Sequence, residues 1–286
     1  MKVDQTYIET NGIRLHVLQD GPTDGPLVLL LHGFPEFSHS WIEQIRHLSA
    51  AGYRVWAPDQ RGYNLSDKPD RVVSYSLDEV AADVVGLIDA AGQERAYVVA
   101  HDWGAAVAWW LASRYPSRVS KMVVMNVPHP KVMVRHLRTF SQLRKSWYML
   151  FFQIPWLPEK LLQARDCAGI SQVLTATSRR GTFSESDLAR YRQAWNQPNA
   201  MRSMVNWYRA IVRRPPDLSG DSRTTVPTLL IWGARDTALG QEMAQPSIDL
   251  CDDGRLVVFE KATHWVHHEE TEAVNHLITD FFGTVG

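Results

Sequence analysis

The chain has 286 residues, with 30 Lys and Arg against 31 Asp and Glu, so its formal net charge at pH 7 is −1. This balanced charge gives no electrostatic basis for binding nucleic acid or an anionic membrane. A hydrophobic fraction of 45% is typical of a globular protein and excludes an intrinsically disordered chain. The length fits one sizeable domain, or a domain with an insertion.

The two cysteines, Cys167 and Cys251, are far apart and lack the spacing of a metal site or a disulfide framework. This usage favours a reducing compartment. The N-terminus has no apolar signal core, and no apolar run approaches the length of a membrane span. We therefore expect a cytoplasmic protein, monomeric or homodimeric, that does not associate with membranes.

Residues 6–20 alternate apolar and polar side chains around Asn11 and Gly12, which predicts a β-hairpin. The continuous apolar run Leu27–Leu31 predicts a strand buried on both faces of a parallel sheet. Further predicted elements are a helix over 39–51, a strand over Tyr53–Ala57, a helix over 76–91 with a capping box of Ser76 and Glu79, and a strand over Val119–Met125. Strands alternate with helices, so we predict an α/β fold with a mostly parallel sheet flanked by helices.

The pattern changes after Asn126. Residues 130–216 contain no buried strand pattern and show helix-like spacing, with breaks at Pro155, Pro158, Gly181 and Pro198. Strands resume at Thr228–Trp232 and Leu256–Phe259, and an amphipathic helix over 269–282 ends the chain. A helical block between two sheet strands predicts an inserted lid. We therefore divide the chain into a core domain, 1–129 and 217–286, and a helical cap, 130–216.

Residues 96–111 have the pattern of a short apolar strand, a sharp turn and an apolar helix. Ala100 and Gly104 flank Asp102 at the spacing of a nucleophile elbow, in which small residues allow the tight turn. An aspartate is ionised at neutral pH, so it can attack carbon without an activating base and form an alkyl ester. The alternative is that Asp102 only caps the following helix.

An ester on Asp102 requires a base that activates water. His264 follows the last predicted strand, and Asp236 follows the strand before it, where its carboxylate can orient the imidazole. The order Asp102, Asp236, His264 is that of nucleophile, acid and base in this kind of fold. Each of the last two is weak evidence alone, because Asp is common in loops and the chain has 11 His.

An oxyanion hole is expected from two backbone amides, those of Trp103 and Phe34. Phe34 lies in the segment His32-Gly33-Phe34-Pro35 directly after an apolar strand. The alternative is a plain strand-ending turn in which Gly33 serves only the backbone shape.

These motifs resemble the α/β-hydrolase superfamily, and within it the branch of soluble epoxide hydrolases and haloalkane dehalogenases. The matching segments span nearly the whole chain: residues 32–36, 59–69, 101–104, 126–130 and 263–265. Ala100 stands where the family usually has Gly and is still small enough for the elbow. Some dehalogenases place their acid where this chain has Asn126, which supports Asp236 as the acid. The resemblance implies that no metal and no organic cofactor is needed.

In soluble epoxide hydrolases, two lid tyrosines donate hydrogen bonds to the epoxide oxygen. The segments around Tyr148 and Tyr208 look like the segments that carry them, so the resemblance implies this role for both residues. A phenol is neutral at pH 7 and can donate to an oxygen that gains charge. The alternative is that both tyrosines are lid core residues with solvent-facing hydroxyls.

Haloalkane dehalogenases resemble this chain too, and the Trp103 indole could donate to a halide. Their usual second halide donor, an Asn, sits where this chain has Phe34, which offers no polar hydrogen. Fluoroacetate dehalogenases carry an Arg next to the nucleophile, and this chain has Trp103 there.

We therefore predict an epoxide hydrolase that forms vicinal diols through an alkyl ester on Asp102. A haloalkane or haloacid dehalogenase with the same triad, and a non-catalytic ligand-binding member of the fold, are the alternatives. The 11 Trp favour an apolar or aromatic epoxide as the substrate beside water. The residues expected around this substrate are Phe34, Pro35, Trp41, Trp103 and Trp265.

Overall fold

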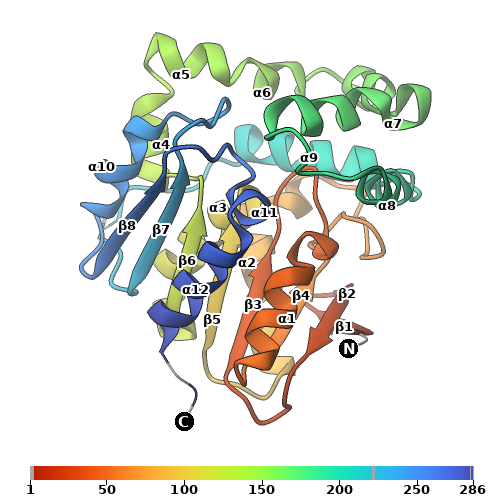
Figure 1. The fold of residues 1–286 in the computed structure, drawn as a ribbon. Helices are drawn as coiled ribbons and strands as arrows, with labels where there is room; N and C mark the ends of the chain where they lie inside the picture. The colour runs from red at the N-terminus through yellow and green to blue at the C-terminus, as the bar shows by residue number, and fades with distance from the viewer. Residues whose placement is uncertain (1–2, 221–222, 284, 286) are drawn as a thin grey trace.

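The structure is a computed structural model that describes residues 3–220, 223–283 and 285. An eight-stranded sheet runs through the molecule in the order β1-β2-β4-β3-β5-β6-β7-β8 (Figure 1). β2 pairs antiparallel with β1 and β4, and the remaining neighbours are parallel. The strands are β1 (Asp4–Thr10), β2 (Ile13–Asp20), β3 (Leu27–Leu31), β4 (Arg54–Pro58), β5 (Ala96–His101), β6 (Val119–Met125), β7 (Thr228–Gly233) and β8 (Gly254–Phe259).

Helices cover both faces of the sheet, α1 and α12 on one side and α2 and α3 on the other (Figure 1). Leu27, Leu29 and Leu31 pack into the cluster beneath α2 and α3. Val28 and Leu30 pack into the cluster beneath α1 and α12. This explains the unbroken apolar run of β3, since both of its faces are buried. The helices around the sheet are α1 (Ile42–Ala50), α2 (Leu77–Ala90), α3 (Trp103–Arg114), α10 (Ala244–Ile248), α11 (Val266–Glu269) and α12 (Thr271–Phe282).

Six helices lie between β6 and β7, and the described residues of this segment form no strand. They are α4 (Pro130–His136), α5 (Phe140–Lys145), α6 (Trp147–Phe151), α7 (Leu157–Thr177), α8 (Glu185–Trp195) and α9 (Ala200–Arg213). Figure 1 shows α5 to α9 stacked across the upper end of the sheet, where the parallel strands have their carboxyl ends. Side chains that follow these strands therefore face the helical layer.

Most predicted elements form close to the expected positions. Asn11 and Gly12 both have positive φ, as a two-residue hairpin turn requires. The predicted helix over 39–51 begins as a 3₁₀ turn, Ser38–Trp41. The helix predicted over 269–282 forms as α12, and the short α11 precedes it. The predicted capping box is only half formed. The hydroxyl of Ser76 accepts from Glu79 N, but the Glu79 carboxylate accepts from Asn11 of the hairpin.

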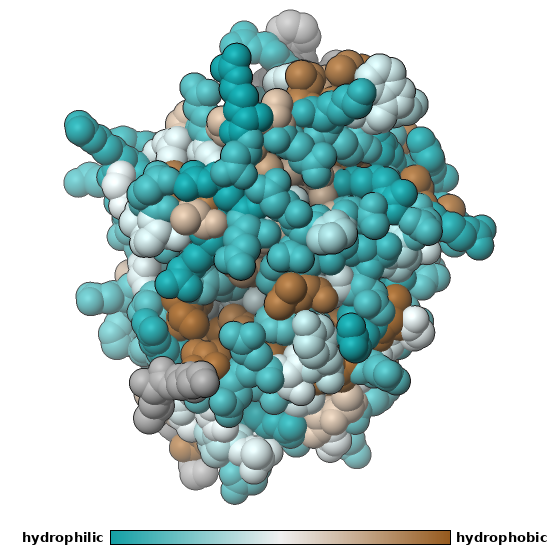
Figure 2. Space-filling view, turned by 90° about the vertical axis from the view of Figure 1, so that its right-hand side faces the viewer, coloured by the Kyte–Doolittle hydropathy of each residue, from teal (hydrophilic) through white to brown (hydrophobic). Residues whose placement is uncertain are grey.

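The surface carries no large apolar area on the face that Figure 2 shows. Hydrophilic residues predominate there, and hydrophobic residues form small separate groups. Within the described ranges, none of the helices combines the length and the apolar character that crossing a membrane would need.

Candidate active site

Asp102 occupies a strained turn between β5 and α3, with φ 48° and ψ −123°. Its side chain makes no capping hydrogen bond to α3, so the helix-cap alternative is wrong. Two glycines allow the turn. A Cβ on Gly33 would lie 2.2 Å from Asp102 Cβ, and a Cβ on Gly104 would lie 2.0 Å from the carbonyl oxygen of Leu31. The elbow therefore needs close backbone approach at both positions.

The structure brings Asp102, His264 and Asp236 together from three loops at the carboxyl ends of strands. Nδ1 of His264 donates to Asp236 Oδ2 over 2.7 Å, and Nε2 lies 3.4 Å from Asp102 Oδ2. Asp236 Oδ1 accepts from the amides of Ala238 and Leu239 at 2.7 and 2.9 Å, which fixes the carboxylate behind the imidazole. This is the geometry of a nucleophile, a base and an orienting acid.

The charges of the three groups depend on one another. Burial alone would raise the pKa of both carboxyls, but hydrogen bonds to His264 and its charge hold the pKa of Asp102 and of Asp236 below their usual range. Burial alone would lower the pKa of His264, but the charge of Asp236 and the hydrogen bond to Asp102 raise it well above its usual value. All three shifts favour an imidazolium between two carboxylates.

One predicted oxyanion donor, the amide of Phe34, already binds Asp102. The Phe34 amide donates to Asp102 Oδ1 over 2.7 Å, from the turn that contains the cis Phe34–Pro35 bond. Trp103, the second predicted donor, is the first residue of α3, where an amide has no partner within its own helix. Both amides belong to the immediate surroundings of Asp102.

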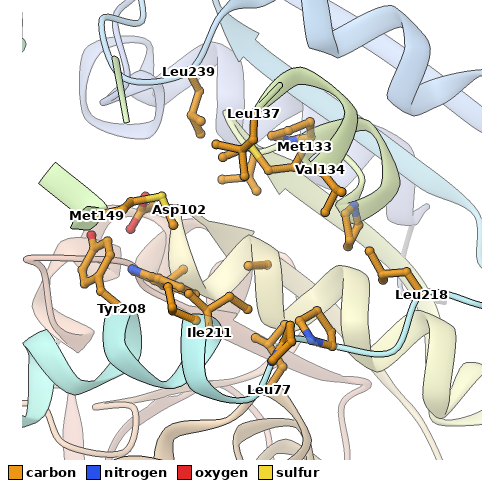
Figure 3. A pocket seen from close by; sticks show the side chains of 18 of the residues that line it. Leu77, Asp102, Met133, Val134, Leu137, Met149, Tyr208, Ile211, Leu218 and Leu239 are labelled. Carbon is orange, nitrogen blue, oxygen red and sulfur yellow. The ribbon is translucent and has the colours of Figure 1, made fainter. Parts of the chain in front are cut away.

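A cavity of about 280 Å³ extends from Asp102 beneath the helical layer (Figure 3). Tyr148 of α6 and Tyr208 of α9 both line it, with ring centroids 5.8 Å apart. Burial raises the pKa of both phenols, and the charge of Asp102 adds to the shift, so both stay protonated. The ring of Trp103 lies 5.0 Å from that of Tyr208, edge to face. The structure thus brings two phenols and the Asp102 carboxylate to one cavity.

The alpha/beta hydrolase fold family model matches residues 26–271. The chain belongs to the α/β-hydrolase fold family. Epoxide hydrolase 1 of Caenorhabditis elegans is 39% identical over 284 residues. The alignment covers 97% of this α/β-hydrolase and 70% of the Caenorhabditis elegans protein. The AB hydrolase superfamily protein YfhM of Bacillus subtilis is 44% identical and covers 96% of each chain. A crystal structure of Bacillus megaterium epoxide hydrolase with an inhibitor is similar with a TM-score of 0.89 and 31% identity, covering 97% and 99% of the two chains.

Two of the predicted pocket residues do not line the cavity of this α/β-hydrolase. Trp41 is fully buried in the core beneath α1, with its ring 4.7 Å from His267. Trp265 donates its indole hydrogen to Thr177 and packs against Phe183. The prediction that Trp41 and Trp265 surround the substrate is therefore wrong. Both large aromatic side chains pack in the protein interior instead.

Of the three other predicted pocket residues, one lines the cavity and two do not. Trp103 lines the cavity. Phe34 and Pro35 are not part of its lining. The Phe34 ring packs against Tyr208 at the end of the cavity, and the Pro35 carbonyl accepts from the Trp195 indole at 2.6 Å. This hydrogen bond to Pro35 therefore connects α8 to the loop beside Asp102.

Most of the cavity wall comes from residues that the sequence patterns did not single out. These are Met133, Val134 and Leu137 from α4 and its end, Met149 of α6, Ile211 and Val212 of α9, and Leu218 and Leu239 from loops. The residues among them that lie in helices follow the apolar period of a helix, but no local signal indicates which helix face meets Asp102.

Glu36 is the centre of a second buried polar cluster next to the triad. Its Oε1 accepts from Tyr191 of α8 at 2.8 Å and from His268 of α11 at 2.7 Å. Its Oε2 lies 3.3 Å from His101 Nδ1 and 3.4 Å from His267 Nε2. A carboxylate oxygen of Glu36 and one imidazole nitrogen each of His101 and His267 lie within 4.8 Å of one another. These three atoms are close enough to coordinate a metal ion.

This cluster contacts His264 through His101. Nε2 of His101 donates to the backbone carbonyl of His264 over 2.8 Å, since a carbonyl can only accept. Burial alone would raise the pKa of Glu36, but His267 and His268 hold it well below its usual range. Glu36 is thus a buried carboxylate that connects β5, α11 and α8.

Proposed function

We propose that this protein is an epoxide hydrolase and that Asp102 is its nucleophile. Relatives named epoxide hydrolases cover nearly the whole chain at 37–39% identity. The observation that carries the proposal is an ionised aspartate at the elbow, with two protonated phenols lining the same cavity. A serine esterase mechanism has no hydroxyl nucleophile at this position.

In the first step, a carboxylate oxygen of Asp102 attacks an epoxide carbon, and the carbon–oxygen bond of the ring breaks. The epoxide oxygen gains charge and takes a proton from Tyr148 or Tyr208. The Phe34 amide stabilises the Asp102 oxygen that does not attack. The product is an alkyl ester of Asp102 with a free hydroxyl on the neighbouring carbon.

Formation of the ester allows His264 to act as a base. Asp102 loses its negative charge, so one of the two anions that raise the pKa of His264 disappears. His264 then gives up its proton, which converts the phenolate back to the neutral phenol, and accepts one from water. The water attacks the ester carbonyl carbon, and the Phe34 and Trp103 amides stabilise the oxyanion. When this intermediate collapses, the bond between the carbonyl carbon and the diol oxygen breaks. The departing diol oxygen takes the remaining proton of the water-derived hydroxyl, which leaves Asp102 ionised again. Asp236 stabilises the imidazolium that results.

We further assign residues 130–216 to the cap, whose helices exclude bulk water from the ester, and 1–129 with 217–286 to the core. The substrate is a small apolar or aromatic epoxide with water, and the reaction needs no metal or organic cofactor. A cytoplasmic monomer or homodimer accords with the composition.

A single turnover in heavy-oxygen water tests the mechanism. Water oxygen should appear in the Asp102 peptide after one turnover, as read by mass spectrometry, because the water attacks the carboxyl carbon. Label that enters only the diol would exclude the covalent route.

A substrate panel separates the competing functions. Styrene oxide should give its diol, while a bromoalkane should release no bromide and an aryl ester no acid. Bromide release without diol formation would indicate a dehalogenase. Saturable binding of styrene oxide without any turnover would indicate a non-catalytic member of the fold.

A further inference from the structure

We infer that the active site selects terminal epoxides, in which only one ring carbon carries an apolar substituent. This inference rests on the proposed epoxide hydrolysis and narrows its substrate class. An internal epoxide has substituents on both ring carbons, so one of them must point away from the cavity, where aromatic rings fill the space.

The nucleophile lies at one end of the cavity and not along its length. Figure 3 shows Asp102, Met149 and Tyr208 gathered at one end, with Leu218 and Leu77 toward the other. An epoxide held between Asp102 and the phenols therefore has open space on one side only. A single substituent can follow that space.

Three aromatic side chains close the catalytic end. The rings of Phe34 and Phe152 lie 5.3 and 4.8 Å from the ring of Tyr208, and 5.8 Å from each other. Phe152 and Tyr208 are each only 5% exposed, and the fully buried Val205 packs with them. None of Phe34, Phe152 and Val205 lines the cavity. A second substituent would have to displace this packed cluster, which costs free energy because close-packed interiors resist overpacking.

The side chains that line the cavity away from Asp102 are apolar as far as its mouth. Ile211 and Val212 follow Tyr208 by three and four residues, so α9 presents them about one turn further along the same face. Met133 and Leu137 form the facing wall. Val134 and Val212 are 45% and 52% exposed, which places the mouth between α4 and the end of α9. An alkyl or aryl substituent fits this path, whereas a charged one would leave its charge unpaired.

The volume agrees with a single substituent. The cavity of about 280 Å³ lies just below the range of roughly 300–1,000 Å³ for small-molecule sites. Its polar groups all gather at the catalytic end, so the remainder distinguishes substrates by shape alone.

Isomeric epoxyoctanes test the inference, since they share a formula and nearly the same hydrophobicity. We expect kcat/KM for 1,2-epoxyoctane to exceed that for trans-4,5-epoxyoctane by about 100-fold, the scale on which an apolar pocket discriminates by shape. Similar kcat/KM values for the two isomers would overturn the inference and leave the proposed function standing. Failure of every epoxide, including 1,2-epoxypropane, would overturn both.

Opening the aromatic cluster should reverse the preference. Phe152→Ala is expected to raise the ratio of kcat/KM for trans-4,5-epoxyoctane to that for 1,2-epoxyoctane by about tenfold, because it empties space behind Tyr208. Leu150→Ala, two residues earlier in α6 but 66% exposed, is the matched control and should leave the ratio unchanged. An unchanged ratio in folded Phe152→Ala would contradict the aromatic barrier.

A second variant tests the open side without disturbing the cluster. Ile211→Phe narrows the path one turn beyond Tyr208. It should lower kcat/KM for 1,2-epoxyoctane by about tenfold and leave 1,2-epoxypropane, whose methyl group ends before this point, within about twofold. Equal losses for both substrates would show that the substituent does not follow this path.

Discussion

Asn126 at the end of β6 donates its side-chain amide to Asp236 Oδ2 over 2.8 Å, and this is the oxygen that accepts the Nδ1 proton of His264. The side-chain oxygen of Asn126 accepts in turn from the amide of Gly233 at 3.1 Å. A single asparagine thus holds the orienting acid against the end of β7.

Asn126→Ala should lower kcat by about tenfold with little change in KM, since a hydrogen bond to a charged group contributes about 1.5–3 kcal/mol and supports the base more than substrate binding. Steady-state kinetics with styrene oxide measure both constants. In a His264→Gln background the same substitution should cost nothing further, because residues that act as a unit are non-additive. A full additional loss there would show that Asn126 acts elsewhere.

The two phenols should act mainly in ring opening. Tyr148→Phe and Tyr208→Phe are each expected to slow ester formation by about tenfold or more, and the double variant by about 100-fold or more, because each removes a proton donor to the departing oxygen. Rapid-mixing measurement of the tryptophan fluorescence change during ester formation gives this rate directly.

Tyr115→Phe is the control for these variants, because Tyr115 is 37% exposed at the end of α3. It should leave the rate of ester formation unchanged. A double variant that forms the ester at the wild-type rate would remove both tyrosines from the mechanism.

The raised pKa of His264 depends on the charge of Asp102, whose Oδ2 lies 3.4 Å from Nε2. Asp102→Asn removes this charge, so it should lower the pKa of His264 toward its ordinary value of about 6.5. An NMR titration of the imidazole measures the change. Glu43→Gln, at an exposed carboxylate on α1, should have no effect. An unshifted His264 in Asp102→Asn would show that Asp236 alone sets its protonation.

The same pKa shift determines how His264 contributes to stability. Because the folded-state pKa lies above the unfolded value of about 6.5, the contribution is complete below that pH and is lost as the pH rises through the folded value. The difference in unfolding free energy between wild type and His264→Gln, from urea denaturation, should therefore shrink as the pH rises through the folded pKa. A difference that grows in that direction would contradict the charged resting state.

The sheet topology explains why the relative positions of three site residues follow from the sequence. Asp102, Asp236 and His264 each follow an apolar strand run, and carboxyl ends of parallel strands meet at one edge of a sheet. The strands themselves were recognisable because β3 and β7 are fully buried, and β5 and the last four residues of β6 nearly so, which gives largely apolar runs.

The substrate cavity could not be derived in the same way. Trp41 and Trp265 are indistinguishable in sequence from pocket tryptophans, but their burial depends on how α11 packs against Trp41 and residues 177–183 against Trp265. Met149 and Leu239 line the cavity because distant segments converge above the sheet. The helical period of apolar residues identifies the apolar face of a helix, but it does not identify the segment or cavity that this face contacts.

Glu36 provides the last test, since it joins the helical layer to the catalytic loops. Its carboxylate is fully buried and accepts from Tyr191 and His268, while His101 beside it supports the His264 carbonyl. Glu36→Gln removes the negative charge that these donors and imidazoles face. We expect a loss of about 2–4 kcal/mol in unfolding free energy at pH 7, since breaking a buried charge network leaves its partners uncompensated.

The pH dependence identifies the charge as the cause. The folded pKa of Glu36 lies well below its ordinary value of about 4.3, so its contribution is present above that pH and is lost as the pH falls through the folded value. The difference between wild type and Glu36→Gln should therefore be constant from pH 5 to 7 and decrease at lower pH. Glu43→Gln disrupts an exposed pair with Arg46 and should cost less than about 1 kcal/mol. If the two variants lost equal stability in chemical denaturation at pH 7, the buried cluster would not hold α8 to the catalytic loops, because a surface pair would do as much.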